Sequence, residues 1–185
     1  MNTQDLLGRI EPLLSRVNKP IQYVGGEHNS IVKEWQDADV RWVLMYPDAY
    51  EVGQPNQGVA ILYEVLNECD WILAERTYSV WPDMEKHMRA AGIPQFTLDG
   101  HRPVRDFDIM SVSLSTELGY TNMLNAIDLA GIPVRQADRT DTDPIVLIGG
   151  HAAFNPEPVA DFIDAAVLGD GEEACLEISE IIRDW

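Results

Sequence analysis

Short apolar runs alternate with amphipathic segments from residue 40 to the last residues of the chain. Short runs bounded by polar residues are typical of buried strands, and apolar residues spaced three and four apart are typical of helices. Strands that alternate with helices are joined by right-handed crossovers, so we expect a parallel sheet covered on both faces. The pattern predicts strands at 40–46, 71–77, 108–114, 145–148 and 165–168, and helices at 58–69, 82–91, 119–130, 155–162 and 171–185.

Five such strands within about 145 residues fit one doubly wound, flavodoxin-like α/β domain with a five-stranded parallel sheet. A chain of 185 residues is long enough to bury one core of this size. Ahead of it, apolar residues between Leu6 and Val17 recur at helical spacing, and an irregular stretch follows. We therefore assign residues 1–38 to an N-terminal helix and arm, and residues 39–185 to the α/β domain.

Charge and cysteine content exclude several classes of function. A net charge of −18 repels phosphate backbones, so nucleic-acid binding is not expected. No apolar run approaches the ~20 residues of a membrane span, and the first residues lack the features of a secretory signal. We therefore expect a cytoplasmic protein without a membrane anchor. Cys69 and Cys175 are too few to hold an iron–sulfur cluster, and neither metal ligands nor a catalytic set is predicted in this chain.

In a doubly wound sheet, ligands bind beyond the carboxyl ends of the strands. The loops at 46–56, 113–119, 149–158 and 169–173 lie at those ends. A flavin phosphate in the first loop would be opposed by Asp48 and Glu51. A phosphoacceptor site needs an aspartate where Ser113 and Ser115 stand, and an autonomous hydrolase needs a nucleophile motif that the chain lacks.

The first loop has a spacing found in another class of domain. Asp48, Tyr50 and Gly53 match the D-x-H-x-x-G loop of cobalamin-binding domains, with tyrosine in the position of the histidine. The Ser113–Thr116 turn and the Gly149-Gly150 pair follow in the order that the same fold uses. Glycine permits close approach of a bulky ligand, and hydroxyls can bond its polar atoms.

The C-terminal third extends this resemblance. Gly149-Gly150, then Pro156-Glu157 and a strand followed by Gly169-Asp170-Gly171-Glu172-Glu173, resemble the end of the N-terminal domain of cobalamin-binding-type radical SAM proteins. Over 23–173 the chain resembles an uncharacterised branch often labelled Fe–S oxidoreductase. The segments that carry this resemblance are YVGGEHNSIVK, YPDAYEVG, ERTYSVWPDME, SLSTELGYTN and GGHAAFNPEPVADFIDAAVLGDGEE.

The resemblance implies a cobalamin-binding-like domain that either presents a corrinoid or acts as a degenerate scaffold. In that family, a 4Fe–4S cluster and S-adenosylmethionine bind in a catalytic barrel, which would follow residue 185 and be this domain's partner. Because Tyr50 is a neutral phenol with a pKa of about 10, a corrinoid here would be base-off and without a histidine ligand. The implied cofactor-binding residues are Asp48, Tyr50, Gly53, Ser113, Ser115, Thr116, Gly149, Gly150, His151, Gly169 and Gly171.

Each of these features also has an explanation that involves no cofactor. Gly149-Gly150 can form a tight turn, the serines can cap a helix, and Glu172 can stabilise a helix N-terminus. The alternative function is therefore a ligand-free interaction module that packs on a partner domain. An exposed apolar patch around Tyr50, Phe154 and Trp185 would favour it.

Overall fold

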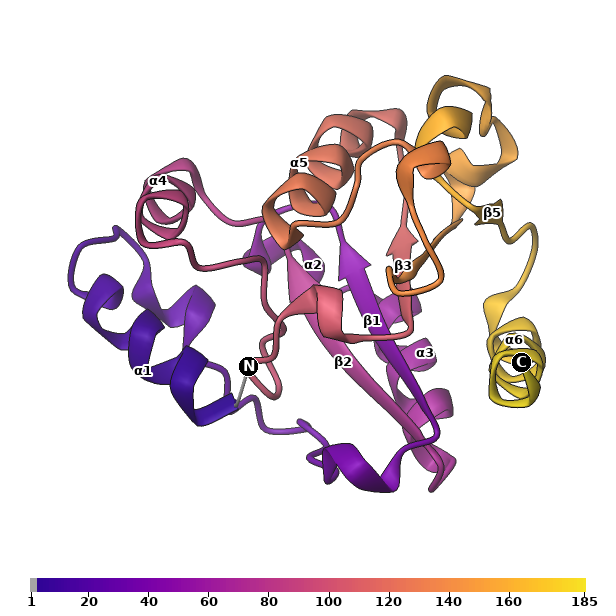
Figure 1. The fold of residues 1–185 in the computed structure, drawn as a ribbon, viewed down its shortest axis with the longest axis horizontal. Coiled ribbons are helices and arrows are strands. Elements are labelled where there is room, and N and C mark those ends of the chain that lie inside the picture. The colour runs from indigo at the N-terminus through magenta and orange to yellow at the C-terminus, as the bar shows by residue number, and fades with distance from the viewer. Residues whose placement is uncertain (1–2) are drawn as a thin grey trace.

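The computed structural model describes residues 3–185. Five parallel strands form one sheet in the order β2-β1-β3-β4-β5 (Figure 1). This is the strand order of flavodoxin-like folds, and the predicted fold class is confirmed. The strands are β1 (Val40–Tyr46), β2 (Ile72–Tyr78), β3 (Ile109–Ser113), β4 (Ile145–Gly149) and β5 (Ala165–Ala166).

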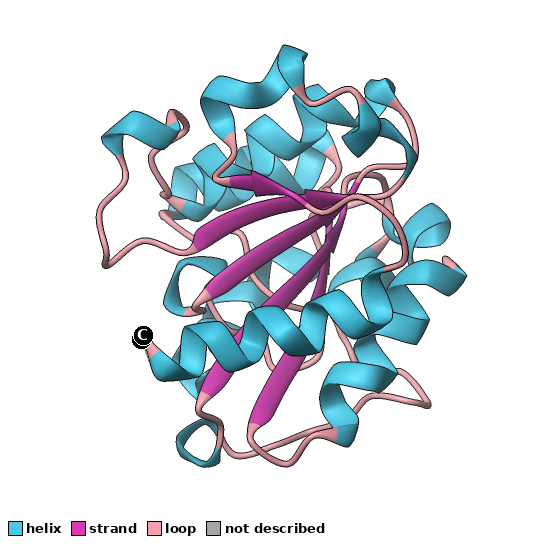
Figure 2. Cartoon of the chain, turned by 90° about the vertical axis from the view of Figure 1, so that its right-hand side faces the viewer, coloured by secondary structure: helices cyan, strands magenta, loops and turns pink. Residues whose placement is uncertain are grey.

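Helices cover both faces of the sheet (Figure 2). On one face, α3 and α6 pack against Trp42 and Leu44 of β1. On the other face, α5 packs against Val43 and Met45, because successive side chains of a strand point to opposite sides. The helices are α1 (Thr3–Leu14), α2 (Tyr50–Gly53), α3 (Gln57–Glu68), α4 (Pro82–Ala91), α5 (Tyr120–Ala130) and α6 (Gly171–Asp184).

The N-terminal extension is packed onto the α/β domain. Leu6 and Ile10 of α1 are fully buried in a cluster with Met84 and Met88 of α4. After α1, the chain runs as an arm with short 3-10 turns at Pro20–Tyr23 and Trp35–Asp37 before it enters β1. The arm follows the outer side of the edge strand β2 (Figure 1).

Two predicted elements differ from the structure. The segment 155–162 forms the 3-10 helix Glu157–Phe162 after a similar turn at His151–Phe154, and the Asn155 side chain caps neither. Proline disfavours the α conformation of the residue that precedes it, which here affects Asn155 and Glu157. The strand predicted at 165–168 is reduced to Ala165–Ala166, which pair with Leu147 and Ile148.

One side chain of α3 lies on the wrong side of its predicted stripe. The helical spacing of apolar residues in 58–69 places Ile61 on the buried stripe together with Leu62, Val65 and Leu66, but 45% of Ile61 is exposed. The buried stripe contains Tyr63 and Asn67, whose polar groups bond to the arm and to β2. Hydrogen bonds to neighbouring segments, which hydrophobic periodicity does not report, therefore set the rotation of this helix.

Across residues 3–185, none of the helices combines the length and the apolar character needed to cross a membrane.

Candidate functional site

A cavity of about 380 Å³ lies at the carboxyl edge of the sheet, between the ends of β3 and β4 and the helices α3 and α6. In Figure 2, α6 crosses the sheet on this face. Its walls include seven of the eleven residues that the sequence singled out. These are Ser113, Ser115, Gly149, Gly150, His151, Gly169 and Gly171.

The lining of the cavity includes large apolar side chains. Trp42 and Leu44 come from β1, while Cys175 and Ile178 come from α6. Trp42 is fixed because its Nε1–H donates to Ser179 Oγ at 2.9 Å. Burial raises the pKa of the Cys175 thiol to about 11, so this group is neutral and unreactive near neutral pH. This part of the wall is suited to an apolar or aromatic group.

One wall is a row of serines. Ser111, Ser113 and Ser115 alternate along β3 and its end, so all three face the cavity. Among residues 3–185, the hydroxyls of Ser111 and Ser113 have no hydrogen-bond partner, and Ser115 Oγ lies 3.1 Å from Tyr46 Oη. Ser111 was not among the predicted site residues, although the alternation that predicts the strand also places it on the same face as Ser113.

The two adjacent glycines have different roles. Gly150 has φ +89°, and a Cβ there would lie 2.7 Å from the Leu114 carbonyl oxygen, so the turn itself requires glycine. Gly149 is an ordinary strand residue, and the nearest atom to a Cβ there would be the Val167 oxygen at 3.9 Å. Nothing in the fold therefore requires Gly149 to be glycine. Its missing side chain leaves open a part of the cavity that a larger residue would fill.

The cavity lining is acidic. Asp170 and Glu172 contribute carboxylates, and no lysine or arginine lines this cavity. His151 lines it as well and is largely exposed to solvent. Such an arrangement disfavours ligands that carry a free, doubly charged phosphate.

The remaining four predicted residues do not line this cavity. Tyr50 is directed to the N-terminal arm, where its hydroxyl donates to Glu27 Oε1 at 2.6 Å and its ring packs edge-on against Tyr78. Gly53 lies against the Tyr78 ring, where a Cβ would clash. Asp48 lines a separate cavity, and the Thr116 side chain makes no capping bond to the turn that follows it.

Tyr50 is held in a form that does not ligate metal. Burial, and then the hydrogen bond to Glu27, raise the pKa of Tyr50 to about 12, so the phenol stays protonated. Across residues 3–185, no group of three His, Cys, Asp or Glu side chains is arranged to hold a metal ion.

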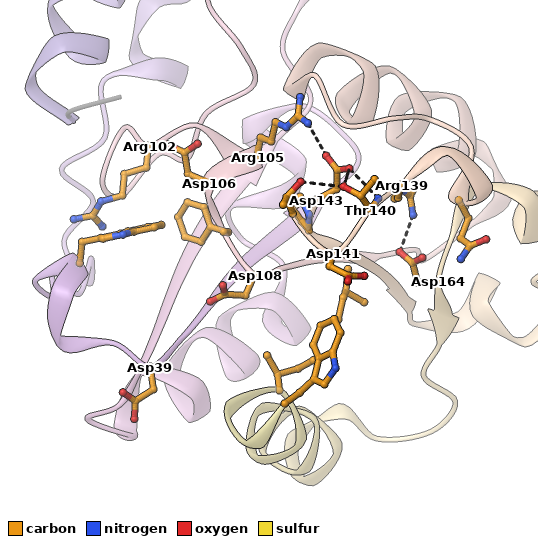
Figure 3. Close-up of a pocket in the computed structure, with 18 residues that line it drawn as sticks. Asp39, Arg102, Arg105, Asp106, Asp108, Arg139, Thr140, Asp141, Asp143 and Asp164 are labelled. Atoms are coloured by element: carbon orange, nitrogen blue, oxygen red, sulfur yellow. Dashed lines mark hydrogen bonds and ion pairs between the residues drawn. The ribbon is translucent and has the colours of Figure 1, made fainter.

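A larger cavity, of about 1040 Å³, lies at the opposite, amino edge of the sheet. None of the predicted site residues lines it. Two of its arginines are held by aspartates, as Figure 3 shows for Arg105 with Asp143 at 2.6 Å and Arg139 with Asp164 at 2.7 Å, and the third, Arg102, is paired with Glu75. The two aspartate pairs fix the loop that precedes β4, and we assign no ligand to this larger cavity.

A family model described as radical SAM proteins, N-terminal, matches residues 58–185, which is well over half of the chain. No curated protein and no solved structure matches the chain. The radical SAM part of the resemblance is thereby confirmed, and its cobalamin-binding part stays a prediction. The chain belongs to the family of N-terminal domains of radical SAM proteins.

Proposed function

We propose that this domain holds the nucleotide tail of a corrinoid in the cavity at the carboxyl edge of its sheet, and that it serves a radical SAM enzyme in this way. The observation that carries the proposal is Gly149, because the fold does not require a glycine at that strand position and its missing side chain keeps the cavity open. A residue that costs strand stability without a backbone reason is typical of close approach by a ligand.

The chemistry of the walls supports a slender ligand with one aromatic and one polyhydroxylated part. The indole of Trp42 and the side chains of Leu44 and Ile178 suit a heteroaromatic base. The unpaired hydroxyls of Ser111 and Ser113 suit the oxygens of a ribose. A volume of about 380 Å³ lies within the range of small-molecule sites.

The position of Tyr50 argues for a corrinoid without a protein ligand on its lower face. Its hydroxyl is bonded to Glu27 and protonated, so it offers no ligand to cobalt. A bound corrinoid would supply radical or alkyl-transfer chemistry at cobalt. The residues of this chain would contribute binding and orientation only.

The proposal is tested by titrating hydroxocobalamin into the domain and following its visible spectrum and its retention on the protein. We expect micromolar binding, with the spectrum of a base-off corrinoid. Gly149→Val should weaken binding about tenfold or more, because its side chain would overpack the cavity. Gly8→Val is the matched control, since a Cβ there also meets open space but lies on α1. Absence of binding to the unaltered domain would contradict the proposal.

A second candidate function, the docking of a partner domain, is favoured by the distribution of exposed apolar side chains. Each of the five strands is followed by a loop or a short helical segment that exposes one large apolar residue. These are Val52, Trp81, Leu118, Phe154 and Leu168. Trp185 is also exposed, but it lies at the amino edge and belongs to a different surface.

These five residues form what we call the apolar carboxyl rim. We propose that this rim faces the catalytic barrel of the parent protein, where the 4Fe–4S cluster and S-adenosylmethionine would bind. Exposed apolar groups gathered at one edge are typical of interaction surfaces. Hydrogen exchange of the domain alone and of the full-length protein provides the test. Amides around Leu118 and Phe154 should gain protection in the longer protein, and unchanged exchange there would argue against docking at this edge.

A further inference from the structure

A second cavity at the carboxyl edge has no role in corrinoid binding, although its lining includes Trp81 of the apolar rim. It measures about 330 Å³ and lies on the face of the sheet covered by α4 and α5. The loops after β1 and β2 form one side of it, and the start of α4 and the side of α5 form the other. Its polar and aromatic lining consists of Asp48, Ser79, Trp81, Glu85, Gln95, Asn122 and Asn125.

Each side-chain amide nitrogen in these walls already donates at least one hydrogen bond. Asn122 Nδ2 donates to the Pro47 carbonyl at 2.9 Å, and Asn125 Nδ2 donates to Glu85 Oε2 at 3.0 Å. Gln95 Nε2 donates to Thr77 Oγ1 and to the Tyr78 carbonyl, both at 2.8 Å.

Several hydrogen-bond acceptors of this cavity have no partner. Within residues 3–185, Asp48 Oδ2, Asn122 Oδ1 and Gln95 Oε1 have no hydrogen-bond partner, and the buried Ser79 Oγ also has none. A cavity whose free groups are mostly acceptors selects a ligand that brings several N–H or O–H donors.

The charges select a cation. Asp48 and Glu85 line the cavity, and no lysine or arginine does. Glu85 is paired with Arg89 at 2.8 Å, but Asp48 has no ion-pair partner among the described residues. An anion would therefore meet an unmatched carboxylate, whereas a cation would match it.

The indole of Trp81, which lines this cavity, already holds an ammonium group over its ring. Lys19 Nζ lies 4.8 Å from the centre of the Trp81 ring, and its charge is matched by Glu51 at 2.7 Å. An ammonium held over an indole gains from the negative face of the ring. The arrangement is an internal example of the interaction that a ligand could repeat.

We propose that this cavity binds a primary ammonium group, carried either by a small aliphatic amine or by a lysine side chain of another protein segment. Asp48 would match its charge and accept one of its protons, and the oxygens of Asn122 and Gln95 would accept the others. A carboxylate next to the ammonium group would be repelled by Asp48, which disfavours binding of amino acids through their α-ammonium group. The site is separate from the corrinoid cavity, and the two proposals fail or succeed independently.

Amide-proton NMR of the domain provides the test, at an ionic strength where the Debye length is about 8 Å. Putrescine represents the free amine, Nα-acetyl-lysine methylamide represents the lysine side chain, and butanediol is the uncharged control. We expect at least one of the two amines to give saturable shifts at the Trp81 indole N–H and at the Asn122 side chain, and butanediol to give none. Saturation by only one amine identifies the source of the ammonium group.

Asp48→Asn should weaken this binding about tenfold or more, since it removes the matching charge. The substitution keeps an oxygen that can accept from the Ala49 N–H, as Asp48 Oδ1 does at 2.7 Å, so the loop should keep its conformation. Asp141→Asn makes the same charge change at the amino edge and should have no effect. The proposal is overturned if neither amine binds, if butanediol binds equally, or if Asp48→Asn and Asp141→Asn behave alike.

Discussion

At the scale of single residues, the two adjacent glycines are expected to differ in their effects: Gly150 is required by the turn, whereas Gly149 matters for the proposed binding. Gly150→Ala should lower the free energy of unfolding by about 1 to 3 kcal/mol, because alanine is strained at φ +89° and meets the Leu114 carbonyl. Gly149→Ala should leave it unchanged or raise it by up to about 1 kcal/mol. Denaturant unfolding measures both changes in free energy, provided that the variants and the unaltered domain have the same m-value. Similar losses for the two variants would show that both glycines are structural.

Local sequence patterns predicted part of the site and missed the rest for a physical reason. Ser113 and Gly150 belong to segments whose strand or turn character is visible in neighbouring residues. The direction of Tyr50 is set by Glu27, which lies in the arm 23 positions earlier and bonds to it across space. Spacing within the loop therefore suggests a ligand position that the side chain does not take up.

At the scale of elements, the outer edge of β2 is satisfied without a neighbouring strand. Ala74 donates to Asn67 Oδ1 and accepts from Asn67 Nδ2, so one side chain takes the place of a partner strand. Arg76 donates to Asp99 and accepts from the Leu98 N–H, and the Ile72 carbonyl accepts from Lys33 Nζ at 2.7 Å. Each outward group at these three positions is bonded.

Asn67→Ala would leave a buried N–H and a buried carbonyl of Ala74 without partners. We expect it to lower the free energy of unfolding by about 2 to 4 kcal/mol. Glu68→Ala, at an exposed position of the same helix, should change it by less than about 0.5 kcal/mol. Urea denaturation of the two variants tests this, and equal effects would contradict the role assigned to Asn67.

Tyrosines around β2 predict a loss of stability at alkaline pH. Burial raises the pKa of Tyr23, Tyr50 and Tyr63 to about 12. The unfolded chain releases these protons from about pH 10 while the folded chain retains them, so the unfolded state binds fewer protons and stability falls as pH rises from about 10 to 12. Unfolding free energies measured across this window should decline, and less steeply in Tyr63→Phe. A flat profile would mean that the tyrosines are accessible.

Hydrophobic periodicity predicted most elements to within a residue or two, because burial on a helix or strand produces a regular pattern. It predicted β5 too long. An apolar run such as 165–168 indicates which residues are buried, whereas the length of a strand depends on how many residues pair with a neighbouring strand. Only Ala165 and Ala166 form regular ladder pairs with β4, although Asp164 and Val167 also donate to it, and the chain turns at Gly169 with φ +104°. The 3-10 turns around Pro156 were missed because a proline followed by apolar residues is equally compatible with the first turn of an α-helix.

At the scale of the whole molecule, the alternation of strands and helices was enough to predict the parallel sheet, because crossover handedness leaves few arrangements. It did not predict how the N-terminal extension packs, since that depends on contacts between segments far apart in sequence. Leu6 and Ile10 of α1 meet Met84 and Met88 of α4. The boundary placed at residue 39 stays a prediction.

A chain truncated to the matched residues 58–185 should not fold. It lacks β1, which lies between β2 and β3 and pairs with both. Without it, the two neighbouring strands lose their ladders and the core loses Trp42, Val43 and Met45. Circular dichroism and amide-proton NMR of the truncated chain should show a disordered or molten protein. A cooperative thermal transition with dispersed amide signals would contradict this expectation.

The bonded outer side of β2 also affects how copies of the protein meet in concentrated solution. A foreign strand can extend a sheet only where it finds a row of unoccupied donors and acceptors. Asn67, Asp99, Leu98 and Lys33 occupy that row on one flank, and on the other flank β5 offers only two residues of regular ladder. The sheet therefore presents no template for growth into intermolecular β-structure, and this protects a domain with an apolar carboxyl rim from edge-to-edge aggregation.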